Sequence, residues 1–301
     1  MLICDTHCDT LYKLAAHPEQ PLDVTMERLK TGGVSLQTLA MYVGNDPRPE
    51  AVQRLADGML VQFSRLKQEG WTQASDPREA GDGQVRVMLS IEGCELFGNS
   101  LDTIAEWRQR GVRMAAITWN HLNALGTPAK INATDGLTPF GRQAVREMAR
   151  LGIAPDTSHL NERGFYDILE MGIVPLASHS CCRALCGHVR NLTDDQLKAL
   201  FGAGGYVGLN FYPWFLSDDG KCTLDTLADH LLHMLELGGE GLIGFGSDFD
   251  GIEAKVPGLE HPGDLPVLFE TLERRGITGE TLEGIAGRNL LSYYDRFDPK
   301  R

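Results

Sequence analysis

The chain has 301 residues and a formal net charge of −13 at pH 7, and it contains no cluster of Lys and Arg. A negative surface of this kind repels phosphate backbones, so no nucleic-acid partner is expected. A hydrophobic fraction of 42% and a charged fraction of 23% are typical of a globular protein, and one α/β barrel accommodates a chain of this length.

The cysteines and the hydrophobic runs indicate in which cellular compartment the protein is expected. The N-terminal segment has neither the basic start nor the long apolar core of a secretory signal, and no run approaches the ~18 apolar residues that span a bilayer. Seven cysteines, an odd number, fit reduced thiols better than a disulfide framework. Cys181, Cys182 and Cys186 lack the paired CxxC spacing of zinc sites and are interpreted as small buried hydrophobic residues. We therefore expect a cytoplasmic protein that does not associate with a membrane.

Short apolar runs rich in β-branched residues alternate with amphipathic stretches along the whole chain. In chain order, strands are predicted at residues 2–4, 34–43, 85–91, 114–118, 153–156, 174–177, 206–210 and 242–246. Helical periodicity is found at residues 51–70, 100–111, 141–152, 161–172, 193–205 and 224–239. Several helical stretches begin with Asn, Ser or Thr and most end with Gly, as capped helices do.

This alternation predicts the fold class. Strands that are apolar nearly throughout are buried on both faces, which requires a parallel sheet covered by helices. Eight such units favour a single α/β domain over residues 1–301, closed into a (β/α)8 TIM-type barrel. An open doubly wound sheet is the alternative.

A barrel of this type carries its active site at the C-terminal ends of its strands. The polar residues that follow the apolar runs are therefore the candidates, and they include three histidines. These residues are His7, Asp9, Glu92, His159, His179, Asp248 and Asp250. They come from five different strands, so packing alone does not explain why they would all face one end of the barrel.

Histidine and carboxylate side chains suit Zn, Mn or Fe, and a carboxylate can bridge two cations through its two oxygens. We interpret Glu92 as the bridge. One metal would take His7 and Asp9. The other would take His159 and His179. Two metals about 3.5–4 Å apart lower the pKa of a shared water and polarise a carbonyl, as amide hydrolysis requires.

Neighbouring residues receive other roles. Asp248 is free to take the water's proton and pass it to the leaving amine. His7 and Asp9 are two apart on an extended segment and point to the same side, with Asp5 nearer the barrel interior as a residue that orients them. Cys8 points away from them. No GxSxG, GxxxxGK[ST] or HExxH motif offers a competing site, and the run GAGGYVG precedes a strand instead of following one.

Taken together, these motifs resemble the membrane (renal) dipeptidase family, peptidase family M19 of the amidohydrolase superfamily. The resemblance covers nearly the whole chain, through DTHCDT, SIEG, DTSHL, PLASHSCCRALCGHVRNLTDDQLKAL, GGYVGLNFYPWFL, GFGSDFDGI and GRNLLSYY. It implies a barrel mouth that binds two zinc ions. The family's ligand positions fall on His7, Asp9, Glu92, His159 and His179.

The resemblance also implies how a substrate is held. Asp248 stands at the position of the acid/base carboxylate near the substrate's amine, and Arg190 at that of the arginine that clamps the terminal carboxylate of a dipeptide. Tyr212 matches an aromatic residue that lines the pocket in relatives. One position departs from the family: Trp119 stands where better-known members carry a histidine, so either His121 replaces that histidine or none serves. The resemblance is also compatible with a homodimer.

The sequence therefore predicts a binuclear zinc dipeptidase that hydrolyses L-Xaa-L-Xaa or L-Xaa-D-Xaa dipeptides, with other divalent transition metals as alternative cofactors. Two other functions stay open. One is a different amidohydrolase reaction, on a lactone, cyclic imide or phosphoester, against which the HxD motif and Glu92 argue. The other is a noncatalytic barrel that keeps its metals for stability or binds a peptide, although a decayed site should have lost at least one of its ligands.

Overall fold

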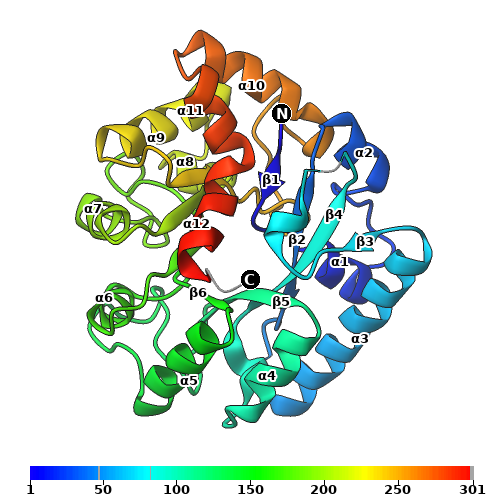
Figure 1. The fold of residues 1–301 in the computed structure, drawn as a ribbon, viewed down its shortest axis with the longest axis vertical. Coiled ribbons are helices and arrows are strands. Elements are labelled where there is room, and N and C mark those ends of the chain that lie inside the picture. The colour runs from blue at the N-terminus through cyan, green and yellow to red at the C-terminus, as the bar shows by residue number, and fades with distance from the viewer. Residues whose placement is uncertain (47, 82, 299–301) are drawn as a thin grey trace.

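The computed structural model describes residues 1–46, 48–81 and 83–298. Its centre is a closed barrel of eight parallel strands surrounded by helices (Figure 1). The barrel strands are β1 (Cys4–Asp5), β2 (Leu36–Tyr42), β4 (Arg86–Glu92), β5 (Val112–Ala116), β6 (Ala154–Asp156), β7 (Leu176–Ser180), β8 (Tyr206–Leu209) and β9 (Ile243–Phe245). The ring closes because β1 pairs with both β2 and β9, and β2 pairs in turn with β4. This closure confirms the predicted (β/α)8 barrel and excludes the open doubly wound sheet.

All eight predicted strands are present, with shifted ends. The largest shift is at β7, which extends through His179 to Ser180, whereas an apolar run ends at Ala177. The strand continues because the barrel supplies hydrogen-bond partners for its polar side chains, for instance Asp156 for Ser178. A ninth strand that was not predicted, β3 (Thr72–Gln73), is only two residues long and pairs with the start of β4.

Helices follow most strands and form the outer layer. The six that the periodicity predicts are α3 (Pro49–Gln68), α4 (Asp102–Gln109), α5 (Pro139–Arg150), α6 (Glu162–Glu170), α7 (Asp194–Gly202) and α9 (Leu224–Glu236). Further helices are α1 (Thr10–Ala16), α2 (Met26–Thr31), α8 (Pro213–Leu216), α10 (Leu265–Arg274), α11 (Gly279–Glu283) and α12 (Asn289–Phe297). Short 3-10 turns lie at Pro77–Glu79, Cys94–Phe97 and Pro262–Asp264, and a π-helical turn at Gly284–Arg288 leads into α12. Within the described ranges, no helix is both long and apolar enough to cross a membrane.

The helix ends follow the capping signals in the sequence. The side chains of Thr138, Asn161 and Thr193 each accept a hydrogen bond from a backbone N–H in the first turn of α5, α6 and α7. Gly152 ends the α5 segment with φ +72°, a left-handed conformation that glycine adopts without steric cost. These caps fix where each helix turns back towards the next strand.

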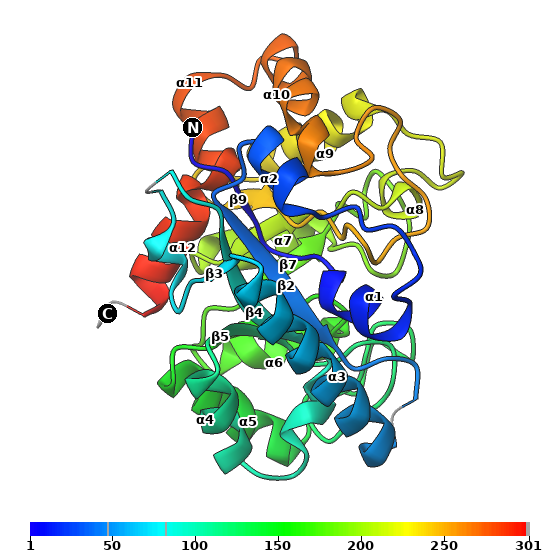
Figure 2. The same cartoon turned by 90° about the vertical axis from the view of Figure 1, so that its right-hand side faces the viewer.

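A separate apolar cluster closes the N-terminal end of the barrel. Leu290, Tyr293 and Tyr294 of α12 pack against the first residues of several strands, among them Leu36 and Met114. Burying a large apolar side chain contributes roughly 1.5–3 kcal/mol to the stability of the fold, so α12 stabilises the barrel by covering its N-terminal end. Figure 2 shows α12 on one side of the molecule and α1 and α8 on the opposite side. The C-terminal ends of the strands, at the α1 and α8 side, therefore remain available for a functional site.

Candidate active site

Six of the predicted side chains meet at the C-terminal end of the barrel. Five of them, His7, Asp9, Glu92, His159 and His179, are less than 9% exposed. Asp248, from the loop after β9, joins them and is slightly more accessible. Five of the six form two overlapping groups, one of His7, Glu92 and His179 and one of His7, Asp9 and Asp248, in which all ligand atoms lie within 4.8 Å of one another. His159 joins the centre through Glu92, whose Oε1 lies 2.9 Å from its Nε2.

Glu92 directs its two oxygens to different partners. Its Oε1 lies 2.9 Å from Nε2 of His159 and 3.4 Å from Nε2 of His179. Its Oε2 lies 3.7 Å from Nε2 of His7. Glu92 is the last residue of β4 and is paired with Tyr42 at the end of β2, so the barrel itself fixes its position. Burial raises the pKa of Glu92 well above its usual range.

His159 and His179 both direct Nε2 to this centre. Nδ1 of His159 lies 3.2 Å from Oδ1 of Asn120, an oxygen that only accepts hydrogen bonds, which favours the tautomer with the proton on Nδ1. Nδ1 of His179 lies 2.7 Å from Oγ of Ser178. Burial lowers the pKa of both histidines well below the usual value, which favours neutral rings. Neutral imidazoles with a fixed Nδ1–H are the form that ligates metals.

His7 faces the carboxylates of the cluster. Its Nε2 lies 3.6 Å from Asp9 Oδ2 and 3.7 Å from Asp248 Oδ1. Burial alone would lower the pKa of His7, but the surrounding carboxylates, Glu92 first, raise it to about 10. In the part of the chain that the structure describes, His7 Nε2 and Asp9 Oδ1 are buried without a hydrogen-bond partner. Buried polar atoms that lack a partner and lie among negative charges fit a bound cation.

The segment from His7 to Asp9 continues the barrel beyond β1. Cys8 forms a parallel bridge with Phe249, and Asp9 N–H donates to the Phe249 carbonyl at 2.9 Å. His7 and Asp9 thus face the same centre, as their spacing predicts. The Cys8 thiol contacts Thr10 Oγ1 at 3.3 Å and lies in the apolar core.

Asp248 adopts an unusual backbone conformation. Its φ is +68°, and its N–H donates to the His7 carbonyl at 3.1 Å. Oδ2 of Asp248 accepts a hydrogen bond of 2.9 Å from Asn210 Nδ2, which leaves Oδ1 facing His7. A Cβ at Gly251 would lie 2.0 Å from Asp9 Oδ2, so only glycine fits beside the cluster. Burial raises the pKa of Asp248.

Arg190 lies beside the cluster in the loop after β7. It is 3% exposed, its guanidinium lies 5.5 Å from the centre of the Phe215 ring, and Nη2 donates to the His179 carbonyl at 3.3 Å. Among the described residues its Nε has no hydrogen-bond partner. Burial lowers the pKa of Arg190 to about 10, well above neutrality, so the group is a buried cation at physiological pH.

A cavity of about 370 Å³ opens over these residues. Its lining includes Glu92, His159 and Asp248 together with Tyr212 and Phe215. Tyr212 O–H donates to Glu253 Oε1 at 2.6 Å, which links the loop after β8 to the loop after β9 across the cavity.

Three aromatic residues on the opposite wall of the cavity, Tyr12, Tyr42 and Trp119, form a chain of edge-to-face rings with centres 4.8 and 4.9 Å apart. Lys130 also lines the cavity. Trp119 stands out in the sequence as the position that departs from the family, whereas Tyr12, Tyr42 and Lys130 were not predicted, because they belong to no metal-ligand pattern. Tyr42 ends β2, Tyr12 lies in α1 and Trp119 follows β5, so their position at or beyond the C-terminal ends of the strands was the available signal.

The remaining candidates from the sequence are His121, Asp250 and the three cysteines, and their contacts are structural. Trp119 lines the cavity, whereas His121 is packed against the Trp119 ring, with centres 5.4 Å apart, and is not part of the lining. Asp250 accepts hydrogen bonds from Thr10 Oγ1, Lys13 Nζ and the N–H groups of residues 23 and 24, so its carboxylate ties loops together. Cys181, Cys182 and Cys186 are buried free thiols, as predicted.

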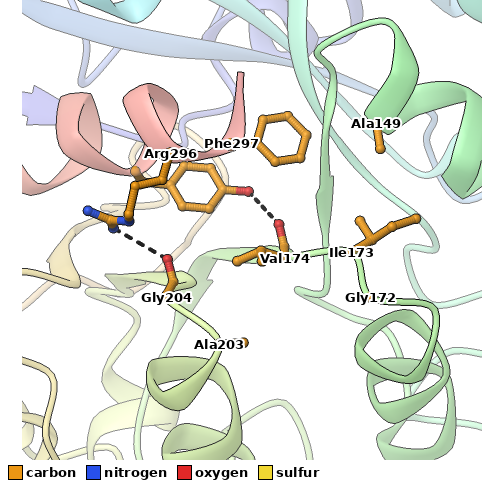
Figure 3. Close-up of a pocket in the computed structure, with 9 residues that line it drawn as sticks. Ala149, Gly172, Ile173, Val174, Ala203, Gly204, Arg296 and Phe297 are labelled. Atoms are coloured by element: carbon orange, nitrogen blue, oxygen red, sulfur yellow. Dashed lines mark hydrogen bonds between the residues drawn. The ribbon is translucent and has the colours of Figure 1, made fainter. Parts of the chain in front are cut away.

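A second cavity, of about 280 Å³, lies at the other end of the barrel beside α12 (Figure 3). There Tyr293 O–H donates to the Val174 carbonyl and Arg296 Nη2 donates to the Gly204 carbonyl. Its lining contains no histidine or carboxylate. Among the described residues, the candidate metal ligands therefore lie at the C-terminal end.

Known proteins resemble this chain to different extents. Residues 1–296 match the family model described as membrane dipeptidase, peptidase family M19. An uncharacterised dipeptidase of Schizosaccharomyces pombe is 35% identical over 223 residues, which cover 71% of this chain and 54% of that protein. Dipeptidase tcpJ of Claviceps purpurea is 34% identical over 213 residues, which cover 69% of this chain and 50% of that protein. The chain thus spans about half the length of these curated relatives.

Solved structures match over their full length. A metallopeptidase from Rhodobacter sphaeroides, liganded with a phosphinate mimic of the dipeptide L-Ala-D-Ala, superimposes with a TM-score of 0.92 at 26% identity and 99% coverage of both chains. A dipeptidase of family M19 superimposes with a TM-score of 0.91 at 28% identity and 98% coverage of both chains. On the strength of the family match along almost its entire length, this chain belongs to peptidase family M19, the membrane dipeptidases.

Proposed function

We propose that the protein is a binuclear zinc dipeptidase that hydrolyses L-Xaa-L-Xaa and L-Xaa-D-Xaa dipeptides. The observation that carries the proposal is the placement of Glu92, whose two oxygens face His159 and His179 on one side and His7 on the other. A carboxylate shared in this way is the arrangement a pair of cations requires. The relative from Rhodobacter sphaeroides, which is liganded with a mimic of L-Ala-D-Ala, supports a D-residue on the carboxyl side.

In this proposal the five most buried side chains hold the metals. Glu92 bridges them, His7 and Asp9 complete one site, and the two remaining histidines, His159 and His179, complete the other. When bound, the metals would polarise the scissile carbonyl and lower the pKa of the attacking water. The partnerless Nε2 of His7 and Oδ1 of Asp9 support this assignment.

Asp248 is proposed to move the proton. Asn210 holds its Oδ2, so Oδ1 remains free beside the centre to accept the proton of the water and deliver it to the leaving amine. Burial raises the pKa of Asp248 towards the range in which a carboxyl group can both accept and donate a proton. The same carboxylate would contact the substrate's ammonium group.

Arg190 is proposed to bind the substrate's terminal carboxylate. A guanidinium recognises a carboxylate through two parallel hydrogen bonds, and the partnerless Nε of Arg190 supports this role. The aromatic residues Tyr212 and Phe215 would then flank the second residue of the dipeptide. A cavity of about 370 Å³ is of the size that encloses a small ligand.

A metal analysis followed by a dipeptide assay tests the proposal. The purified protein, reconstituted with zinc, should contain two equivalents and hydrolyse members of a library of L-Xaa-L-Xaa and L-Xaa-D-Xaa dipeptides. Glu92→Ala should lose most of the metal and nearly all turnover. A metal-replete protein that cleaves none of these dipeptides would refute the proposal. Turnover of a lactone, cyclic imide or phosphoester instead would support a different amidohydrolase reaction.

A further inference from the structure

Two buried aspartates occupy equivalent positions on opposite sides of the candidate metal centre. Asp5 is the last residue of β1 and Asp156 is the last residue of β6, and both are less than 5% exposed. Each is followed by a threonine whose N–H donates to a carbonyl of a neighbouring strand, that of Phe245 for Thr6 and that of Leu176 for Thr157. The Thr157 hydroxyl donates to the same Leu176 carbonyl, whereas Thr6 Oγ1 lies 2.8 Å from the Phe245 carbonyl and 2.5 Å from the Ser178 carbonyl.

Asp5 connects β1 to the loop after β9 through three hydrogen bonds, which we call the Asp5 brace. Its Oδ1 accepts the N–H groups of His7 at 3.2 Å and Ser247 at 2.9 Å, and its Oδ2 accepts the Ser247 hydroxyl at 2.5 Å. Ser247 directly precedes Asp248. The Asp5 brace therefore acts on His7 and Asp248 through the backbone.

Asp156 connects β6 to β7 through an equivalent set of three hydrogen bonds, which we call the Asp156 brace. Its Oδ1 accepts the N–H groups of Ser158 at 2.9 Å and Ser178 at 3.0 Å, and its Oδ2 accepts the Ser178 hydroxyl at 2.5 Å. Ser178 directly precedes His179. The two braces thus use the same atoms of an aspartate and a serine.

The braces differ in one contact. Because the Ser178 hydroxyl hydrogen points to Asp156, its oxygen is left to accept, and it lies 2.7 Å from Nδ1 of His179. The chain of donors therefore runs from His179 Nδ1–H to Ser178 Oγ and from Ser178 Oγ–H to Asp156. This direction keeps the proton on Nδ1 and the Nε2 lone pair free. Nothing comparable joins Ser247 to an imidazole, since its Oγ donates to Asp5 and lies 3.2 Å from the His7 carbonyl.

We propose that Asp156 and Ser178 are positioning residues that set the tautomer of His179 and thereby the affinity of the His159 and His179 half of the centre for metal, whereas Asp5 and Ser247 position backbone only. This inference rests on the proposed two-metal function. Partners behind a metal-binding histidine typically change metal affinity by 10- to 100-fold when they are removed.

The isosteric change Asp156→Asn tests the direction of the chain. An asparagine can still accept the two backbone N–H groups through its oxygen, but its NH₂ group would donate to Ser178 Oγ. The serine hydroxyl would then donate to His179 Nδ1, and the ring proton would move to Nε2, the ligand atom. We expect Asp156→Asn and Ser178→Ala each to weaken zinc binding at one of two sites by about 10- to 100-fold, measured by competition with a chelating dye.

Ser247→Ala is the matched control, because it removes a hydroxyl that donates to an aspartate at the same distance of 2.5 Å. Ser247→Ala should weaken zinc binding clearly less than Ser178→Ala does, and a folded Ser178→Ala protein that binds zinc as the wild type does would overturn the proposal. Equal weakening by Ser178→Ala and Ser247→Ala would also overturn it, because the braces would then be merely structural.

A readout that needs neither metal nor turnover is the ¹⁵N NMR signature of His179 in the metal-free protein. Nδ1–H is expected in the wild type and Nε2–H in Asp156→Asn, and the same tautomer in both would refute the inference. Failure of this inference is distinct from failure of the proposed function. If the wild type binds two zinc ions and cleaves dipeptides, and Asp156→Asn and Ser178→Ala behave like the wild type, the positioning role of Asp156 and Ser178 is refuted while the proposed function stands.

Discussion

The Nε2 atoms of His159 and His179 lie 3.1 Å apart. With the proton of each ring on Nδ1, the tautomer that the contacts to Asn120 and Ser178 favour, two lone pairs face each other across this distance. Burial lowers the pKa of both rings, which disfavours a charged ring that would donate between them. A cation that accepts both lone pairs would remove the repulsion, so we expect the centre to depend on bound metal.

Metal removal should therefore destabilise the fold. At a free zinc concentration a thousandfold above Kd, a ligand that binds only the folded state stabilises it by about 4 kcal/mol. Thermal melts of the chelated and zinc-reconstituted protein should show a higher Tm with zinc. His179→Gln should lose most of this difference. His233→Gln, which removes a histidine paired with Asp194 on the outer helices, should retain it. Identical melting temperatures with and without zinc would contradict this expectation.

Arg190 should matter only for substrates with a free terminal carboxylate. Losing hydrogen bonds to a charged group costs about 1.5–3 kcal/mol, so Arg190→Ala should lower kcat/KM for a free dipeptide by about 10- to 100-fold. The effect should appear mainly in KM, and the C-terminal amide of the same dipeptide should be turned over equally by wild type and variant. Arg183→Ala changes an arginine of the same loop that contacts only backbone carbonyls of that loop and the Glu162 carboxylate, and activity should be unchanged. If wild type handles the amide and the free dipeptide alike, the clamp does not exist.

Trp119 and His121 can be separated by mutation. Because Trp119 lines the cavity and His121 packs behind it, His121→Ala should leave kcat and KM close to the wild-type values. Trp119→Ala removes part of a cavity wall and should raise KM most for dipeptides with large apolar side chains. Steady-state kinetics on a small and a large dipeptide distinguish the two residues. A collapse of kcat in His121→Ala would instead assign His121 a direct role in the reaction.

The barrel was predictable because its strands are apolar on both faces and its helices carry cap signals. An apolar run did not predict the polar end of β7. The strand continues there because Asp156 accepts hydrogen bonds from the N–H and hydroxyl groups of Ser178, and Ser158 Oγ accepts one from the His179 backbone N–H. The two-residue strand β3 is too short to show any period. The helices after β9, α10, α11 and α12, were not predicted from the sequence.

The meeting of the candidate ligands at one end of the barrel was also predictable, since residues that follow parallel strands lie at the same end. Asn210 was not, because it ends a predicted strand and its role depends on a bond to Asp248, 38 residues away. The same holds for Ser178 and Ser247, whose partners Asp156 and Asp5 are close only in the fold. No nearby residue in the sequence marks the role of such residues, because their partners come within hydrogen-bond distance only when the strands pair.

The N-terminal end of the barrel carries a buried positive charge that is paired with two aspartates. Arg113 of β5 is fully buried beneath the Tyr294 ring and lies 3.2 Å from Asp76 and 3.1 Å from Asp298. Asp76 also binds Arg78 through both oxygens, at 2.7 and 2.8 Å. Burial would raise the pKa of Asp76, but the hydrogen bonds from Arg78 and the charge of Arg113 outweigh it and hold that pKa below the usual value.

The effect of Asp76→Asn should therefore depend on pH. A carboxyl group whose pKa is lower in the folded than in the unfolded state stabilises the fold above the unfolded pKa of about 3.9, and this contribution disappears as pH falls through the folded value. We expect the variant to lose about 2 kcal/mol of unfolding free energy at pH 7 and progressively less as the pH falls below 4, measured by urea unfolding. Asp46→Asn breaks a pair of identical spacing, Asp46 with Arg48, on the exposed surface and should cause no measurable change. An Asp76→Asn penalty that stays constant from pH 7 to pH 3 would show that the ionised carboxylate does not stabilise Arg113.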